Sequence, residues 1–208
     1  HTMPSSPEQI TVRGSAKINL FLDVLGRRDD GFHEIETLLQ PIGMWDELSL
    51  RPIGSGIELE GDDPTIPWDS GNLCYRAAEA LLARAHRGGG VRISVEKGIP
   101  HGAGLGGGSS DAAAVLVGLN EMFGLGLSKE ELKGIGLSLG SDVPFFIGGG
   151  PAVGRGRGEI LEPAEGLGTG WILVVKPDIT VSTEWAYRNL KIGLTRDGGV
   201  ATLKQLIE

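Results

Sequence analysis

A glycine-rich segment at residues 100–111 combines residue types that could bind phosphate. It lies between an expected strand that ends near Lys97 and an expected helix that begins at Ser110 or Asp111. Glycines without a Cβ let successive backbone amides point at one anion, and a helix N-terminus adds about half a positive charge. The segment therefore predicts a phosphate-binding loop. Its residues are Pro100, Gly102, Ala103, Gly104, Leu105, Gly106, Gly107, Gly108, Ser109 and Ser110.

The two serines that end this loop could contact the metal ion that accompanies a nucleotide. The hydroxyl of Ser109 or of Ser110 could donate to phosphate oxygens or bind Mg²⁺. The sequence does not decide between them. The alternative is a glycine turn that only lets the helix pack closely on the sheet, but six glycines within residues 98–108 exceed that need.

A lysine and an aspartate far apart in the sequence could form a catalytic pair. Lys17 and Asn19 are two residues apart, so a strand places both side chains on one face. Asp142 follows an expected helix that ends at Gly140, in a turn that Pro144 restricts. A carboxylate beside a lysine could accept the proton of an alcohol that attacks a γ-phosphoryl group. Two unrelated surface charges or a structural ion pair are the open alternatives.

The loop does not fit the common nucleotide motifs well. A Walker A motif is excluded because its lysine is missing. Residues 102–107 match the dinucleotide fingerprint G-x-G-x-x-G. In a dinucleotide-binding fold this fingerprint follows the first strand, and an acidic residue about 20 residues further on ends the next strand. The acidic residue at about that spacing here is Glu121, which lies in a helical pattern. A nicotinamide-dependent oxidoreductase is disfavoured but open, as is a nucleotide-binding module without catalysis.

The elements around these residues alternate between strand and helix. Period-two patterns predict strands at 10–13, 18–24, 47–50, 56–60 and 91–97, and an apolar run predicts a buried strand at 171–175. Helices are expected to begin at Asp69 or Ser70, at Ser110 or Asp111, and at Ser128, where residues 128–131 form a capping box. The pattern is typical of an α+β fold, with the domain boundary in the glycine-rich stretch 148–170.

Composition limits the class of protein. The chain of 208 residues fits one soluble domain, or one domain and part of a second. Its net charge of −8 disfavours nucleic-acid binding, and neither a membrane span nor a secretory signal is expected. The single cysteine, Cys74, excludes an intramolecular disulfide and a cysteine-based zinc cluster and favours the reducing cytoplasm.

Several segments together resemble the GHMP kinase superfamily, over most of positions 10–190. They are residues 15–22, 30–37, 71–78, 100–113, 139–146 and 154–161. Residues 30–37, taken with Lys17 and Asn19, narrow the resemblance to one branch. That branch acts on a cytidyl diphosphate alcohol of the non-mevalonate isoprenoid pathway, unlike the homoserine, mevalonate and galactose kinases.

The resemblance implies a two-domain α+β fold. A mixed-sheet, ATP-binding N-terminal domain would span residues 3–160, and a ferredoxin-like, substrate-binding domain would begin at 161–208. It also implies ATP- and Mg²⁺-dependent phosphorylation of the 2-hydroxyl of the cytidyl diphosphate alcohol, with Asp142 as general base and Lys17 as its charged partner. Family members normally continue past this point, so the chain is expected to be truncated and weakly active. A monomer or weak dimer is expected.

The resemblance also implies a substrate site. Asn19 would hold the erythritol or phosphate portion near Asp142, His33 would bind the cytosine edge, and the rings of Phe32 and Tyr187 would stack on the two faces of the base.

Several alternatives stay open at these positions. Phe32 could be ordinary core, His33 could cap a turn, and Trp185 could replace Tyr187 as the second ring. Asn72 could contact the nucleotide or cap a helix. A mevalonate- or homoserine-type kinase, or a non-catalytic nucleotide-binding fragment, is the alternative function.

Overall fold

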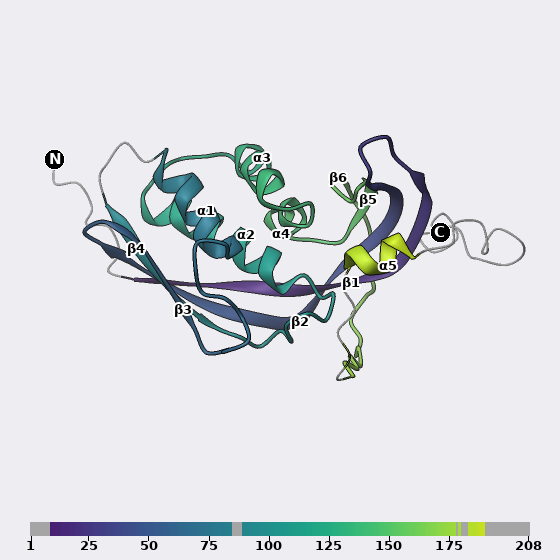
Figure 1. Cartoon of the computed structure of the whole chain (residues 1–208), viewed down its shortest axis with the longest axis horizontal. Coiled ribbons are helices and arrows are strands. Elements are labelled where there is room, and N and C mark those ends of the chain that lie inside the picture. The colour runs from purple at the N-terminus through teal and green to yellow at the C-terminus, as the bar shows by residue number, and fades with distance from the viewer. Residues whose placement is uncertain (1–8, 85–88, 178, 180–182, 190–208) are drawn as a thin grey trace, which may run out of the picture.

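The computed structural model describes residues 9–84, 89–177, 179 and 183–189 (Figure 1). Its strands are β1 (Ile10–Arg27), β2 (His33–Ile53), β3 (Gly56–Gly61), β4 (Gly90–Glu96), β5 (Ala152–Gly156) and β6 (Ile160–Pro163). Its helices are α1 (Leu73–Leu82), α2 (Gly107–Met122), α3 (Lys129–Leu139), α4 (Val143–Gly148) and α5 (Thr183–Arg188). None of the helices in these ranges is long and apolar enough to cross a membrane. The expected α+β class is confirmed.

One mixed sheet carries α1 to α4 on a single face (Figure 1). Its strand order is β3-β4-β2-β5-β6, and β1 pairs with β2 off this path. β3 and β4 are parallel, whereas the other pairs are antiparallel. One edge of β2 pairs with β1, and its other edge pairs with β5 near its start and with β4 near its end. In Figure 1, α1 to α4 cover one face of this sheet.

β1 and β2 are longer than the sequence predicted. The expected strands at 10–13 and 18–24 are joined in β1, whose register against β2 shifts in several places. Residues 33–46 of β2 were not among the expected strands, and they include Pro41, which cannot donate to a ladder. Pro41 lies after the pairing with β5 ends at Leu39 and before the pairing with β4 begins at Glu47. Its missing N–H therefore interrupts no pairing on that edge.

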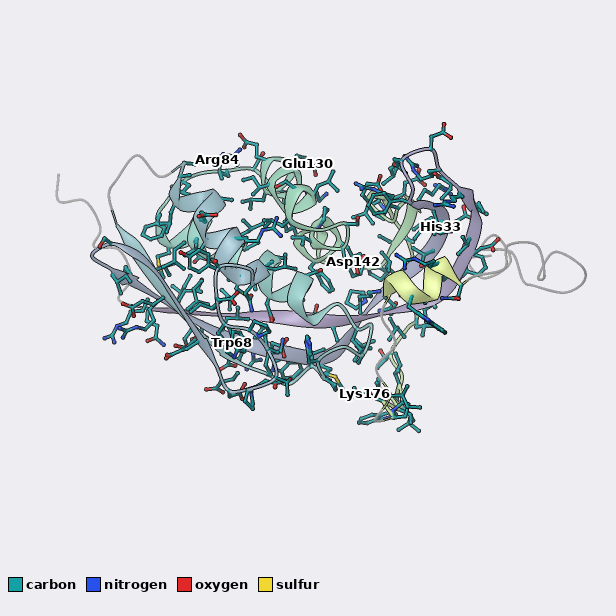
Figure 2. The ribbon with its side chains drawn as sticks, in the orientation of Figure 1. His33, Trp68, Arg84, Glu130, Asp142 and Lys176 are labelled. Carbon is teal, nitrogen blue, oxygen red and sulfur yellow. The ribbon has the colours of Figure 1, made fainter. Side chains whose placement is uncertain are left out.

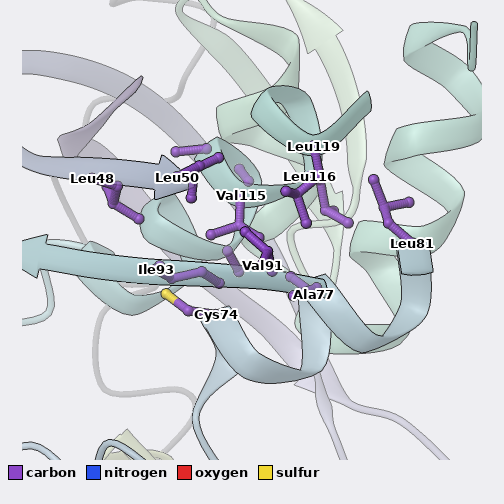
Figure 3. Packing of buried hydrophobic residues seen from close by; sticks show 14 of the residues in the cluster. Leu48, Leu50, Cys74, Ala77, Leu81, Val91, Ile93, Val115, Leu116 and Leu119 are labelled. Carbon is purple, nitrogen blue, oxygen red and sulfur yellow. The ribbon is translucent and has the colours of Figure 1, made fainter. Parts of the chain in front are cut away.

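The main core lies between the sheet and α1, α2 and α3. Alternate residues of β4 point into it, and ten of the sixteen residues of α2 are buried, so α2 is the central helix. Burying one such apolar side chain contributes about 1.5–3 kcal/mol, so this cluster is the main source of stability. Figure 3 shows its members Leu48, Leu50, Cys74, Ala77, Leu81, Val91, Ile93, Val115, Leu116 and Leu119.

The cap of α1 is Asn72, so the expected start at Asp69 or Ser70 was wrong. The Asn72 side chain accepts the N–H of the second helical residue at 2.9 Å, and its amide nitrogen donates to the Pro67 carbonyl at 2.9 Å. Asp69 instead accepts the backbone N–H of Gly71 at 2.8 Å, which folds the turn before the helix. The capping interpretation of Asn72 is therefore confirmed.

Local sequence patterns predicted the start of α3 correctly but not the start of α2. α3 begins after Ser128, which forms the predicted capping box with Glu131. α2 begins at Gly107, three residues before Ser110, so the expected start was wrong. The reason is Gly106, which has φ 77° and ends the loop in a left-handed conformation without a side-chain cap.

The expected buried strand at 171–175 is wrong. The described residues contain no strand there, and Trp171, Leu173 and Val175 are exposed. Val174 alone of these residues packs on a small cluster around Ala16. An apolar run indicates burial, but a strand also needs a neighbour, and the described part of the chain supplies none. The boundary between 3–160 and 161–208 stays a prediction, and β6 crosses it.

Two helical glycines provide a matched test of this packing. A Cβ on Gly118 in α2 would lie 2.5 Å from the buried Leu50 Cδ1, whereas a Cβ on Gly134 in α3 would meet nothing within 4 Å. Alanine favours helix over glycine by about 1 kcal/mol, but overpacking a core costs about 1–3 kcal/mol. We expect Gly118→Ala to lower the free energy of unfolding and Gly134→Ala to raise it, measured by urea denaturation. A stabilised Gly118→Ala variant would contradict the close contact between α2 and β2.

Candidate functional site

The glycine loop connects β4 to α2, as predicted. The residue before α2, Gly106, has φ 77°, and a Cβ there would lie 2.7 Å from the Phe146 ring and 3.2 Å from Lys17 Cγ. The Lys17 backbone N–H donates to the Leu105 carbonyl at 2.9 Å, which holds the loop against β1. Along the loop, Pro100, Gly102, Gly104 and Gly108 are exposed, Ala103, Gly106 and Gly107 are half-buried, and Leu105 is buried.

The two serines of the loop point to different neighbours. Ser110 is buried, and its hydroxyl has no hydrogen-bond partner within the described residues. It faces β1, because a Cβ on Gly14 would lie 2.6 Å from Ser110 Oγ. Ser109 is half-buried and faces the turn before α4, where a Cβ on Gly140 would lie 3.9 Å from its hydroxyl. Ser109 is therefore the serine whose hydroxyl is better placed to reach a ligand beside Asp142.

Lys17 and Asp142 lie together beside the loop. Lys17 Nζ is 3.7 Å from Asp142 Oδ2, and the two side chains are 10% and 39% exposed. Asp142 precedes α4, a helix that the sequence did not predict, and its carboxylate makes no capping bond among the described residues. The alternative of two unrelated surface charges is wrong. In the view of Figure 2, Asp142 lies between the helices and the β1–β2 hairpin that carries His33.

A chain of hydrogen bonds fixes Lys17 from the side of the sheet. Lys17 Nζ donates to Asn19 Oδ1 at 2.8 Å, and Asn19 Nδ2 donates to Thr37 Oγ1 at 2.7 Å. The Thr37 hydroxyl donates in turn to the Phe21 carbonyl at 2.7 Å. Thr37 is buried in β2, so its hydroxyl sets which end of the Asn19 amide faces Lys17. Sequence reasoning assigned Thr37 no role.

Phe32 and His33 lie at the tip of the β1–β2 hairpin. Phe32 is 51% exposed, so the alternative that it belongs to the core is wrong. The Asp30 carboxylate accepts its backbone N–H at 3.1 Å, which shapes the turn. The guanidinium carbon of Arg157 lies 4.6 Å from the centroid of the Phe32 ring. His33 is half-buried at the start of β2.

The second aromatic of the predicted substrate site is not placed. Tyr187 belongs to α5, but its side chain lies outside the described residues. Trp185, in the same helix, is 60% exposed. The choice between the two rings therefore stays a prediction.

A buried ion triad lies beneath the loop. Lys97, just after β4, hydrogen-bonds the carboxylates of Asp46 and, at 2.7 Å, Asp111. Asp46 Oδ1 also accepts the backbone N–H groups of Gly98 and Ile99, each at 2.8 Å. Burial raises the pKa of Asp111 to about 7, although Lys97 opposes this. Burial also favours neutral Lys97, yet the two carboxylates raise its pKa overall.

A magnesium ion bound to a nucleotide would need few oxygen ligands from the protein. Among the described residues, no group of three or more His, Cys, Asp or Glu side chains is suited to hold a metal ion. Mg²⁺ commonly takes one or two protein oxygens and completes its shell with substrate phosphates and water. The Ser109 hydroxyl, half-buried and facing the turn before α4, is such a donor, so the site fits this mode. Beside the loop, Asp62, Lys97 and Pro100 border a hollow of about 440 Å³.

The dinucleotide-binding alternative is wrong. The loop follows the fourth strand of a mixed sheet, and that strand is antiparallel to β2. A dinucleotide fold places this fingerprint after the first strand of a parallel sheet. Glu121 lies within α2, far from a strand end.

Comparison with known proteins identifies the family. A model of the GHMP kinases N terminal domain matches residues 72–150. The 4-diphosphocytidyl-2-C-methyl-D-erythritol kinase of Syntrophotalea carbinolica is 50% identical over 88% of this chain and 65% of its own length. The kinase of the same name from Geobacter sulfurreducens is 45% identical over 89% of this chain and 67% of its own length. The chain belongs to the GHMP kinase family, and it spans about two thirds of the length of these curated relatives.

The fold of the chain is similar to those of solved kinase structures. A crystal structure of 4-(cytidine 5'-diphospho)-2C-methyl-D-erythritol kinase has a TM-score of 0.72 and 39% identity, covering 88% of this chain and 65% of that one. Homoserine kinase from Cytophaga hutchinsonii has a TM-score of 0.67 at 20% identity, covering 100% of this chain and 65% of that one. The second similarity shows the fold alone. The expected GHMP kinase fold is confirmed by both the family model and the first structure.

Gly106 tests whether the loop binds phosphate. Gly106→Ala would force a left-handed alanine, at about 1–2 kcal/mol, and push a methyl group toward Phe146 and Lys17. We expect ATP affinity to fall about tenfold or more, measured by the ATP-dependent shift in melting temperature. The control is Gly149→Ala, because Gly149 has φ 81° but no atom within 4 Å of its Cβ position. Equal loss of ATP binding in both variants would contradict a specific role of the loop.

Proposed function

We propose that the protein uses ATP to phosphorylate the 2-hydroxyl of 4-diphosphocytidyl-2-C-methyl-D-erythritol, a step of isoprenoid precursor synthesis by the non-mevalonate pathway. The observation that carries this proposal is the pair of Lys17 and Asp142, 3.7 Å apart beside the glycine loop. The names of the relatives that are 45% to 50% identical support the choice of substrate. Membership of the GHMP kinase family supports ATP as the phosphoryl donor.

The loop and the start of α2 would hold the triphosphate of ATP. Backbone N–H groups at a helix N-terminus bind phosphate well, because they are unpaired and carry partial positive charge. The chain has a net charge of −8, so local amides and Lys17 must supply the attraction. The hollow at Asp62, Lys97 and Pro100 would accept the nucleoside. Bound Mg²⁺ would neutralise phosphate charge, and the Ser109 hydroxyl is better placed to bind it than that of Ser110.

Asp142 would act as the general base. Its carboxylate would accept the proton of the 2-hydroxyl while that oxygen attacks the γ-phosphorus of ATP. The Lys17 ammonium, 3.7 Å away, would orient the carboxylate and attract the negative oxygens of the transferring group. Asn19 Oδ1 accepts a hydrogen bond from Lys17 at 2.8 Å, so the ammonium is held in place before substrate binds.

The tip of the β1–β2 hairpin would bind the cytidyl group. Phe32, half exposed, would stack on one face of cytosine, which contributes about 1–3 kcal/mol at comparable nucleic-acid sites. His33 would hydrogen-bond the edge of the base, and Tyr187 would supply the second ring. Asn19 would contact the erythritol or phosphate portion near Asp142.

The remaining expectations concern the cell and the assembly. Cys74 is a free, buried thiol, and burial raises its pKa, which fits an unreactive core residue of a cytoplasmic enzyme. The proposed partners are ATP and the small-molecule substrate, with neither nucleic acid nor membrane. The state of a monomer or weak dimer stays a prediction.

Asp142→Asn tests the proposed reaction. We expect ADP release that depends on the cytidyl alcohol to fall about 10²–10⁴-fold, because the amide cannot accept the proton. ATP should still raise the melting temperature of the variant, since the loop is unchanged. Mevalonate and homoserine serve as control acceptors for the unchanged protein. Preferred phosphorylation of either one would refute the substrate, and unaltered turnover of Asp142→Asn would refute the general base.

Thr37 tests whether the hydrogen-bond chain positions Lys17. Thr37→Val keeps the shape but removes the hydroxyl that orients Asn19, so we expect kcat to fall about 10- to 100-fold with KM for ATP nearly unchanged. Thr37→Ser keeps the hydroxyl and should retain most of the activity. Urea denaturation of both variants measures the accompanying loss of stability, about 1 kcal/mol for Thr37→Val. Equal kcat values for the two variants would contradict the role of Thr37.

A further inference from the structure

Arg157 lies against the aromatic ring at the tip of the β1–β2 hairpin. It belongs to the turn between β5 and β6, yet its guanidinium carbon is 4.6 Å from the centroid of the Phe32 ring. This distance is within the roughly 6 Å over which a cation is attracted to the face of an aromatic ring. A residue far along the chain therefore covers one face of the ring that the proposed function assigns to cytosine.

The turn that carries Arg157 is fixed to the sheet. β5 pairs with β2, with Gly156 opposite Ile35. The Gly156 backbone N–H donates to Glu34 Oε1 at 3.2 Å. Glu159 accepts the backbone N–H of Arg157 at 2.5 Å, and its other carboxylate oxygen lies 3.8 Å from Arg157 Nε. The turn that holds the guanidinium over Phe32 is thus attached to β2, the strand that begins at His33.

The spacing of the pair leaves room for a base on one side only. A base inserted between two flat groups needs about 7 Å, twice the usual contact distance. The 4.6 Å between Arg157 and Phe32 excludes such an insertion. Phe32 remains 51% exposed with Arg157 over the ring, so part of its surface is accessible to a base.

We propose that Arg157 is a positioning residue for pyrimidine recognition. It closes one face of Phe32 and fixes the ring, so that the base of a cytidine diphosphate compound stacks only on the other face. The inference rests on the proposed function, because it assumes that Phe32 faces cytosine. Arg157 acts through Phe32 and does not itself take part in phosphoryl transfer.

Substitutions at Arg157 test this proposal. We expect Arg157→Met to weaken binding of CDP, measured by calorimetry, about 3- to 30-fold, which is the range of cation–π energies. Arg157→Lys keeps a cation and should restore part of the affinity. In turnover assays, KM for the cytidyl alcohol should rise while kcat and KM for ATP stay the same. The matched control is Arg13→Met, because Arg13 lies 4.9 Å from the ring of Trp45, away from the site.

A double-mutant cycle separates an effect through Phe32 from a general one. In a Phe32→Leu background, Arg157→Met should change CDP affinity no further. Unchanged CDP affinity in Arg157→Met, an equal loss in the Arg13→Met control, or additive effects in the cycle would each overturn the proposal. So would a failure of the unchanged protein to bind CDP.

The two proposals fail in different ways. If the expected CDP pattern holds but no alcohol is phosphorylated, the proposed reaction is wrong and the role of Arg157 stands. If the cytidyl alcohol is phosphorylated but Arg157→Met leaves its KM unchanged, only the role of Arg157 is wrong.

Discussion

The site depends most on the buried ion pairs that the Lys97 ammonium forms with Asp46 and Asp111. Lys97 lies directly after β4 and binds both Asp46 of β2 and Asp111 of α2, and Asp46 also accepts the backbone N–H groups of Gly98 and Ile99, just before the loop. Both ends of the glycine loop are thus fixed to one charge cluster. Removing one partner of a buried ion pair costs about 3–5 kcal/mol, because the other charge stays buried. The path of the loop therefore depends on three charged residues that lie beneath it.

Local patterns in the sequence predicted the features that depend on neighbouring residues. The capping box at Ser128 needs only residues within one helical turn, and it is present. Lys17 and Asn19 share a face because strand side chains alternate, and their side chains are hydrogen-bonded. The position of the glycine loop between a strand and a helix could be predicted in the same way.

Features that depend on distant residues could not be predicted. A proline is unusual within a strand, and the gap between the pairings with β5 and β4 along β2 shows why Pro41 is tolerated there. A buried threonine is typical of any strand, so nothing local distinguished Thr37, whose partner Asn19 lies on another strand. The contact of Arg157 with Phe32 joins residues from two different turns. The apolar run at 171–175 shows the converse, because its pattern indicated burial that the described residues do not provide.

The continuity of β2 has a consequence for which molecules the site accepts. His33 and Thr37 are four residues apart on this strand, which corresponds to about 13 Å. The strand therefore sets the distance between the aromatic tip and Thr37, whose hydroxyl binds Asn19 beside Lys17. Under the proposed function, a diphosphate bridge is the spacer that lets one molecule reach both ends. Mevalonate and homoserine have neither base nor bridge, so they can occupy one end at a time.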